Sequence, residues 1–225
     1  MNKKIITLTL LLAGLAILFT GCINIGGGRQ IRGTGQVVSR QMDVGDFNSI
    51  DVSGNFVIIY RQSTERALTI SMQENLFDHL DVNTRGGTLS VGSRRGFDTT
   101  NANRPRMYVY APYLTAADLS GAVGTSDWDN IETERFSLDI SGAVSFNAGL
   151  NVERLDIDAS GAASITLRGS AANINIDGAG ALNVNASDLA IGGGSVDISG
   201  AANVTLSTLD NVTVRTSGVA RVREG

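Results

Sequence analysis

The stretch Asp139-Ile-Ser-Gly-Ala143 occurs again without change at residues 197–201, and related copies lie between and around these two. Aligned on their shared glycine, the copies centre on Gly121, Gly142, Gly161, Gly180, Gly200 and Gly218. Neighbouring glycines are therefore 21, 19, 19, 20 and 18 residues apart. A nearly constant period of this length is typical of a repeat architecture, in which each unit packs on the next.

Each repeat has the alternation of a β-strand on both sides of its glycine. The residue four positions before the glycine is apolar, as in Leu138 and Ile157, and the residue after it is polar. The same period of two resumes after the glycine, with apolar Phe146 and Ile165 four positions further on. This pattern predicts strands with one buried face. The glycine can adopt a positive φ, so we expect the chain to bend at each Ser-Gly-Ala.

Stacking of these repeats would place the apolar positions in one continuous interior. Parallel strands in successive repeats would then lie about 4.8 Å apart, and crossovers between parallel strands are right-handed. The sequence therefore predicts an all-β single-stranded right-handed parallel β-helix with rungs of about 19–20 residues. The alternative is an antiparallel β-sandwich with a hairpin at each Ser-Gly-Ala. It explains the alternation, but not the return of the same residue types at the same offset.

The part before residue 116 is less regular. Alternating or β-branched runs predict strands near residues 67–72, 80–83, 88–91 and 107–110, with a tight turn at residues 85–87. Residues 74–80 are the one segment in which we expect a turn or two of helix. Residues 92–106 are polar and basic, and we expect an excursion loop there.

The first 22 residues have the pattern of an exported lipoprotein. Lys3 and Lys4 precede an uncharged, mostly apolar run that ends just before Gly21 and Cys22. This predicts a lipoprotein signal peptide over residues 1–21 and a lipid on Cys22, the sole cysteine of the chain. Residues 22–43 then read as a glycine-rich, lipid-anchored tether, and residues 44–225 as one folded domain. The expected location is the cell envelope, with the lipid holding the protein to the outer membrane.

The charge of the chain excludes one class of partner. Removal of residues 1–21 takes away the only two lysines, which leaves 16 arginines against 22 acidic residues and a net charge of −6. Nucleic-acid binding calls for a basic stripe, so nucleic acid is not an expected partner.

Several segments outside the repeats carry a family resemblance. They are Phe47-Asn-Ser-Ile-Asp-Val-Ser-Gly54, Glu74-Asn-Leu-Phe-Asp78, Gly87-Thr-Leu-Ser-Val91 and Tyr108-Val-Tyr-Ala-Pro112. Together with the Ser-Gly-Ala repeats that follow, they resemble the head GIN domain family of bacterial envelope proteins, which are labelled auto-transporter adhesins. The resemblance implies a single-stranded right-handed β-helix. It implies little about activity, and it brings no catalytic residues to this chain.

A column of aspartates is the first candidate site. Three residues before each aligned glycine stand Asp118, Asp139, Asp158, Asp177 and Asp197. Stacked at the spacing of β-strands, these carboxylates would repel one another, and a Ca²⁺ ion would relieve the repulsion. The alternative is a repeated corner turn in which each carboxylate accepts a hydrogen bond from its own backbone. No other cofactor is expected.

Two further sets of residues are candidates for ligand binding. A face of small hydroxyls and amides is formed by Ser145, Asn147, Ser164, Thr166, Asn183, Asn185, Asn203 and Thr205. This face suits a glycan, but it is also the usual solvated face of a stacked repeat. The excursion loop carries Arg94, Arg95, Arg104 and Arg106, which suit an anionic ligand or a solvated loop. Trp128 is a candidate for stacking on a sugar.

Catalysis has little support in these residues. The single histidine, His79, lies among apolar residues, and no cluster of histidine and cysteine has metal-ligand spacing. We therefore expect no catalytic residues and no enzyme. The favoured function is an adhesin or binding module for a glycan or an envelope partner. The alternatives are a polysaccharide-active enzyme built on a β-helix and a structural envelope scaffold.

Overall fold

The structure is a computed structural model that describes residues 30–94, 96–98, 104–126 and 128–225. The described chain is almost entirely β-strand, as predicted, and it has one short 3₁₀ helix, η1 (Glu74–His79), in the segment where helix was expected. None of its helices is long and apolar enough to cross a bilayer. The predicted signal peptide, Cys22 and the first part of the tether lie outside the described residues.

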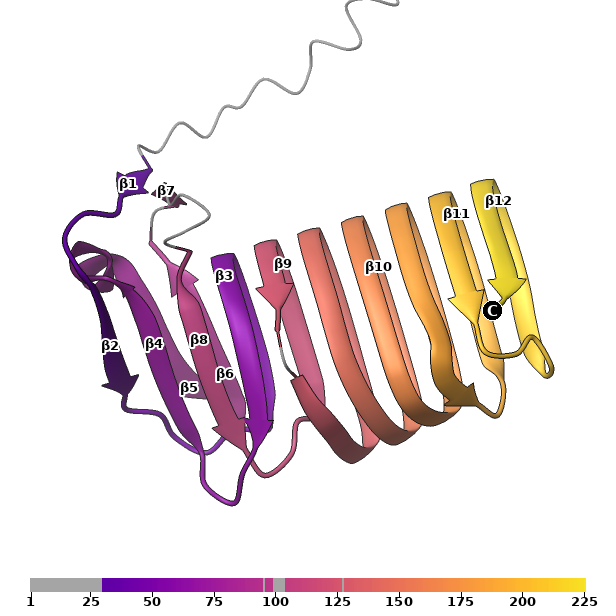
Figure 1. The fold of residues 1–225 in the computed structure, drawn as a ribbon, viewed down its shortest axis with the longest axis horizontal. Helices are drawn as coiled ribbons and strands as arrows, with labels where there is room; N and C mark the ends of the chain where they lie inside the picture. Colours follow the sequence, from indigo (N-terminus) through magenta and orange to yellow (C-terminus); the bar gives the residue numbers. More distant parts are fainter. Residues whose placement is uncertain (1–29, 95, 99–103, 127) are drawn as a thin grey trace, which may run out of the picture.

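Twelve strands make up the β structure of the described part (Figure 1). They are β1 (Ile31–Arg32), β2 (Val37–Met42), β3 (Ser49–Gln62), β4 (Ala67–Gln73), β5 (Leu80–Arg85), β6 (Thr88–Ser93), β7 (Phe97–Asp98), β8 (Arg106–Ala111), β9 (Ala116–Thr125), β10 (Trp128–Ile191), β11 (Gly194–Leu206) and β12 (Val212–Glu224). The strands expected from the sequence at 67–72, 80–83, 88–91 and 107–110 are confirmed as β4, β5, β6 and β8.

The main sheet is mixed. Its order is β12-β11-β10-β9-β3-β8-β4-β2, with β6 also paired to β3 and β5 paired to β6. Strand β3 and strands β9 to β12 pair in parallel. In contrast, β2 with β4, β4 with β8, and β5 with β6 are antiparallel. A parallel β-helix through the whole of residues 44–225 is therefore not confirmed. The hairpins of the alternative sandwich are also absent from the paired Ser-Gly-Ala copies, because their strands are parallel.

Residues 116–224, called here the parallel stack, keep every repeat in register with the next. Gly121 lies beside Gly54 on one side and Gly142 on the other, and Gly200 lies beside Gly180 and Gly218. All of these glycines have positive φ, as predicted. A Cβ on Gly142 would lie 2.5 Å from the carbonyl oxygen of Gly121. The coils can approach this closely only because the column contains no side chain.

The interior of the stack is apolar and closely packed. The inward positions predicted from the repeats are buried, including Leu138, Ile157, Ile176 and Val196. The last strand differs: Val214 is 40% exposed and Val222 is half-buried, because nothing in the described chain packs beyond β12.

Aromatic residues fill the N-terminal end of the parallel stack. The ring of Trp128 lies 5.5 Å from that of Tyr60 and 5.1 Å from that of Phe146, measured between centroids. Its indole N–H donates a hydrogen bond to the carbonyl oxygen of Ile58 at 3.0 Å. The side chain is 1% exposed, so the suggestion that Trp128 stacks on a sugar is wrong.

The folded part begins before residue 44. Within the segment that the sequence assigns to a tether, β1 pairs with β7 and β2 pairs with β4. The Thr34 amide also donates to the side chain of Asn75 at 2.8 Å. Residues 30–43 are therefore held against the N-terminal strands.

The glycine column predicts the effect of adding one methyl group. In Gly161→Ala the new Cβ would lie 2.6 Å from the carbonyl oxygen of Gly142, at a backbone φ of +114°. We expect a loss of several kcal/mol of unfolding free energy, because both the contact and the dihedral are unfavourable. The matched control is Gly86→Ala, where φ is +58° and nothing lies within 4 Å, and its cost should be about 1 kcal/mol. Urea denaturation of the two variants compares them, and equal midpoints would contradict this role of the column.

The aromatic cluster gives a second prediction. Trp128→Ala should lower the unfolding free energy by about 3–5 kcal/mol, because it leaves a large cavity and removes the donor to Ile58. Trp128→Phe keeps most of the buried area and should cost less than half as much. Thermal denaturation followed by circular dichroism measures both, and a stable Trp128→Ala protein would show that the cluster is dispensable.

Candidate functional site: the outer faces of the parallel stack

The predicted aspartates form a row across the strands. Asp139 lies beside Asp118 in the register of β10 and β9, and Asp177 lies beside Asp197 in that of β10 and β11. The row extends to Asp51 of β3 at one end and stops at Arg215 of β12 at the other. Burial raises the pKa of Asp118, and the negative charges of Asp51 and Asp139 raise it further. At Asp118, therefore, neighbouring carboxylates repel one another as the spacing of the row predicts.

The described residues contain no group of three or more acidic, histidine or cysteine side chains placed to hold a metal ion. The one hydrogen bond that these residues show to a predicted aspartate comes from the Ser137 hydroxyl, at 3.4 Å from Asp139 Oδ2. Neither calcium nor the local corner turn gains direct support from this geometry, and both stay predictions.

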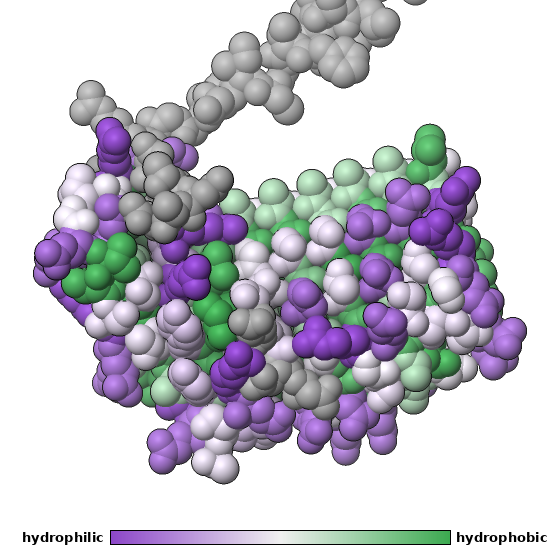
Figure 2. All heavy atoms as spheres, in the orientation of Figure 1, coloured by the Kyte–Doolittle hydropathy of each residue, from purple (hydrophilic) through white to green (hydrophobic). Residues whose placement is uncertain are grey.

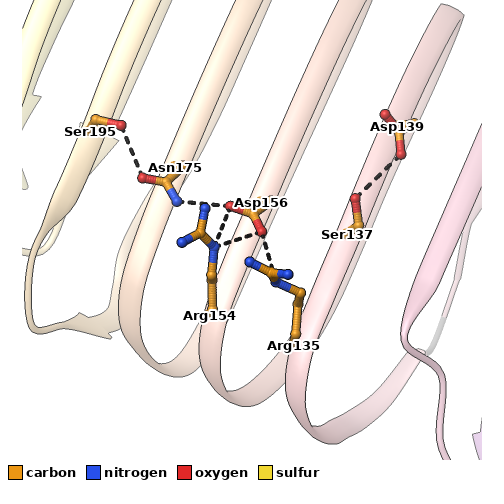
Figure 3. Close-up of polar contacts among 7 residues, drawn as sticks. All are labelled: Arg135, Ser137, Asp139, Arg154, Asp156, Asn175 and Ser195. Atoms are coloured by element: carbon orange, nitrogen blue, oxygen red, sulfur yellow. Dashed lines mark hydrogen bonds and ion pairs between the residues drawn. The ribbon is translucent and has the colours of Figure 1, made fainter.

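A second row of polar side chains runs beside the aspartates and is linked by hydrogen bonds (Figure 3). Asp156 is its centre, and Arg154 Nε donates to both carboxylate oxygens of Asp156 at 2.9 Å. Arg135, on the preceding coil, places its Nε 3.3 Å from Asp156 Oδ2. On the following coil, Asn175 Nδ2 donates to Asp156 Oδ1 at 2.8 Å, and the Ser195 hydroxyl donates to Asn175 Oδ1 at 3.0 Å.

These contacts decide the charge state of Asp156. Partial burial alone would raise its pKa, but hydrogen bonds from Arg154 and Asn175 and the positive charges of Arg154 and Arg135 outweigh burial and lower it. Asp156 is therefore an anion whose acceptors are used within the protein. The two rows line a shallow hollow of about 430 Å³, which also includes Arg215.

The predicted face of hydroxyls and amides lies on the other side of the glycine column. All eight residues are exposed except Thr205, which is half-buried. Some of them contact their neighbours on the stack. Asn147 Oδ1 accepts from Arg168 at 2.9 Å, and Thr205 Oγ1 accepts from Arg223 Nε at 3.1 Å. Asn185 Oδ1 accepts from the Ser187 hydroxyl at 2.9 Å and from the Ser187 amide at 3.3 Å. The remaining five residues of the face are exposed.

A long open groove joins this face to the glycine column. Its volume is about 580 Å³, and a row of exposed alanines lines it, after which we call it the alanine groove. The alanines are Ala122, Ala143, Ala162 and Ala181. Ser145 and Ser164 line one side, and Asn55 and Arg104 also line it. Figure 2 shows the pale green row of weakly hydrophobic residues along the upper edge of the stack. The groove runs across the strands, so a ligand in it would contact several repeats.

The arginines of the predicted excursion loop do not share one environment. Arg104 lines the alanine groove, where its guanidinium donates to the carbonyl oxygen of Ala122. Burial lowers its pKa. Arg106 is exposed and belongs to β8, while Arg94 is exposed just after β6. Arg95 lies outside the described residues.

Asp156 and its arginines were not predicted from the sequence. Alignment on the glycines places alanine, serine, aspartate, asparagine, serine and threonine at this position in successive repeats, so no constant residue type marks it. The available signal was the arginine two positions earlier in two consecutive repeats, Arg135 and Arg154. In register, these two arginines lie beside a single carboxylate.

Solved structures with a similar fold come from bacteria. A crystal structure described as a "putative adhesin" from Bacteroides fragilis aligns with 87% of this chain and 100% of its own, with a TM-score of 0.76 and 17% identity. Another, from Parabacteroides distasonis and described in the same words, covers 87% and 100%, with a TM-score of 0.57 and 18% identity. A third, described as a "putative lipid binding protein" from the same species, covers 88% and 100%, with a TM-score of 0.55 and 16% identity. These likenesses establish the shared fold.

No curated protein matches the chain. Its sequence does match a family over residues 46–224, which includes the irregular N-terminal strands as well as the parallel stack. The chain therefore belongs to the family described as "putative auto-transporter adhesin, head GIN domain".

Proposed function

We propose that this protein is a non-enzymatic adhesin of the cell envelope, which binds an extended glycan in the alanine groove. Membership of an adhesin-like family supports the binding role. The observation that carries the choice of site is the continuity of the groove, because Ala122, Ala143, Ala162 and Ala181 follow one another without a large side chain between them. A polymer can lie along such a row, whereas a compact ligand would use only part of it.

The chemistry of the groove suits a chain of sugars. The alanine methyl groups can pack on the apolar C–H faces of sugar rings, and hydroxyls such as those of Ser145 and Ser164 can both donate and accept hydrogen bonds. Because the strands repeat at about 4.8 Å, the same contacts recur along the groove. Affinity would then come from several weak contacts in series.

The stack also favours binding through its rigidity. Backbone pairing fixes each coil against the next, and the Asp156 network joins successive coils on the neighbouring face. A surface that is already ordered loses less conformational entropy when a ligand binds. The binding face therefore needs no rearrangement to accept its ligand.

The remaining features belong to the same proposal. Residues 1–21 serve as an export signal, and Cys22 carries the lipid that anchors the protein to the outer membrane. Residues 116–225 form the coils of a right-handed β-helix, which hold the groove away from the anchor. Glycan binding needs no Ca²⁺, because no carboxylate is among the residues that line the alanine groove.

The proposal predicts the outcome of a glycan-array experiment on the full chain, with and without Ca²⁺, in which bound glycans are checked for cleavage. We expect binding of polysaccharides that is independent of Ca²⁺ and leaves them intact. Cleavage of a bound glycan would show an enzyme, and an array without any binding would overturn the proposed function.

A matched pair of variants tests the position of the site. Ala162→Phe places a bulky side chain in the groove and should weaken binding of the polysaccharide about tenfold or more, because the ligand can no longer lie along the row of alanines. Ala172→Phe is the control, since Ala172 is also exposed but lines a different hollow of the stack. Equal effects of the two changes would place the glycan outside the alanine groove.

The Asp156 network gives a prediction about pH. Since its pKa in the folded protein is lowered below the unfolded value, ionised Asp156 stabilises the fold above that unfolded value, near 3.9, and the contribution is lost as pH falls through the folded pKa. Asp156→Asn should cost about 1 kcal/mol at pH 7, because the arginine partners are half-exposed. Thermal denaturation at pH 7 and in acid should show this difference shrinking in acid. A difference independent of pH would exclude the ionic contribution.

A further inference from the structure

A small polar cavity lies away from the alanine groove, on the outer face of β5, β6 and β3. Its volume is about 230 Å³. It is lined by Asp51, Ser53, Asp81, Asn83, Ser90, Val91, Gly92, Ser93 and Arg94. Seven of these nine residues carry a polar or charged side chain. The cavity is much more polar than the alanine groove.

The pairing of the three strands explains why a hollow forms there. Ser90 of β6 lies between Asn83 of β5 and Asp51 of β3. Two residues further along β6, Gly92 lies beside Asp81 of β5. On its other side it is close to Ser53 of β3, since a Cβ added to Gly92 would lie 2.6 Å from Ser53 Oγ. Side chains two residues apart in a strand point to the same face. Gly92 is therefore the open floor of a depression surrounded by polar side chains.

Backbone geometry does not require glycine at this position. Gly92 is not among the residues with positive φ, unlike the glycines of the repeat column. Its effect is to leave space where any other residue would place a side chain. The Ser53 hydroxyl is also the end of a side chain that can rotate, so an alanine at position 92 is compatible with the fold.

The polar groups of the cavity are not satisfied by one another. In the part of the chain that the structure describes, no hydrogen bond or ion pair joins the side chains of Asp51, Ser53, Asp81, Asn83, Ser90, Ser93 or Arg94 to another protein group. The Asp156 network is the opposite case, since its carboxylate is bound on three sides by side chains. The donors and acceptors of the cavity are therefore free to bind a ligand.

The composition of the cavity restricts the class of ligand. Two carboxylates against one guanidinium, with Asp118 beside Asp51, make the site negative and disfavour an anion. A single metal ion is disfavoured because no three acidic side chains converge in the described chain. The carboxylates only accept hydrogen bonds and Arg94 only donates them, so a ligand with several hydroxyls, which do both, can satisfy the set. The volume equals about seven or eight waters at roughly 30 Å³ each, enough for one sugar ring.

We propose that this cavity binds a single sugar unit without negative charge, either neutral or carrying an amino group. The inference rests on the glycan-binding function proposed above and assigns it a second site. The alanine groove takes the length of a polymer, whereas the cavity over Gly92 takes one ring. Carboxylates at two corners of the cavity bind hydroxyl or ammonium donors, and the serines and Asn83 bind the remaining groups.

Isothermal titration of the full chain with single sugars tests this site. The probes are galactose, mannose, glucose, glucosamine and N-acetylglucosamine, with glucuronate as the anionic counterpart. We expect at least one uncharged or amino sugar to bind, and glucuronate to bind at least about tenfold more weakly than it. Absence of binding by all of the uncharged and amino sugars at about 10 mM would overturn the inference, as would a preference for glucuronate.

Variants then locate the bound sugar. Gly92→Ala fills the floor without a change of charge, and Asp81→Asn removes one carboxylate. Each should weaken binding of the sugar about tenfold, the scale of one hydrogen bond to a charged group. Asp177→Asn is the control, because it also removes a single aspartate carboxylate, but one that lines a different hollow of the stack. If Gly92→Ala fails to fold, as seen by circular dichroism, Asp81→Asn still decides the result.

The two proposals fail in different ways. If polysaccharides bind and Ala162→Phe weakens their binding, but single sugars do not bind, the cavity inference is wrong and the proposed polysaccharide site in the groove is supported. If single sugars bind and Gly92→Ala weakens them, while Ala162→Phe leaves polysaccharide binding unchanged, the cavity stands and the groove is misplaced. If neither polysaccharides nor single sugars bind, both proposals are wrong.

Discussion

The close approach of backbone to backbone at the glycine column is the constraint on which the parallel stack depends. At each aligned glycine the position of a Cβ is occupied by the peptide group of the preceding coil. Register cannot slip by one residue there, because any residue with a side chain would meet that backbone. Since the glycine fixes the register, the apolar positions four before and four after it must also stack, and the interior is continuous.

In-register stacking also decides the electrostatics of the surface. When one repeat carries an aspartate at a given offset, the next repeat places another directly beside it, and the pKa of Asp118 responds to that repulsion. The aspartate row ends at Arg215, which has the opposite charge. In the neighbouring row, Arg135 and Arg154 pair with the carboxylate of Asp156. The electrostatic environment of a surface side chain therefore depends on the residues at the same position in the adjacent repeats. A substitution that changes the charge of one repeat changes that environment in its neighbours.

The repeats were predictable from the sequence because their signals are local and recur. A glycine with positive φ, an inward residue four positions before it and an outward aspartate each appear several times, so chance agreement is small. The N-terminal strands gave no such repetition. The tight turn at Gly86 and Gly87 allows only antiparallel pairing of β5 and β6, but the antiparallel pairing of β2 and β4 joins segments about 30 residues apart and has no such local signal. The sheet is mixed for that reason.

The candidate sites were predictable only in part. The row of aspartates and the face of hydroxyls follow from the period of the repeats, and the structure places them on opposite sides of the glycine column. Trp128 could not be placed from the sequence, since it lies among polar residues and its burial depends on a distant acceptor, the carbonyl oxygen of Ile58. The cavity over Gly92 was equally hidden, because its lining comes from three strands whose pairing had to be known first.

Satisfaction of polar groups distinguishes a structural row from a binding site on this protein. The Asp156 row is charged and prominent, yet its carboxylate accepts from Arg154 and Asn175 and pairs with Arg135, so a ligand would have to replace bonds that already exist. Around Gly92 the same kinds of side chain face a space without protein partners in the described chain. A ligand there replaces only water, which costs less than replacing a charged hydrogen bond. The less conspicuous of the two polar surfaces is therefore the better placed to bind.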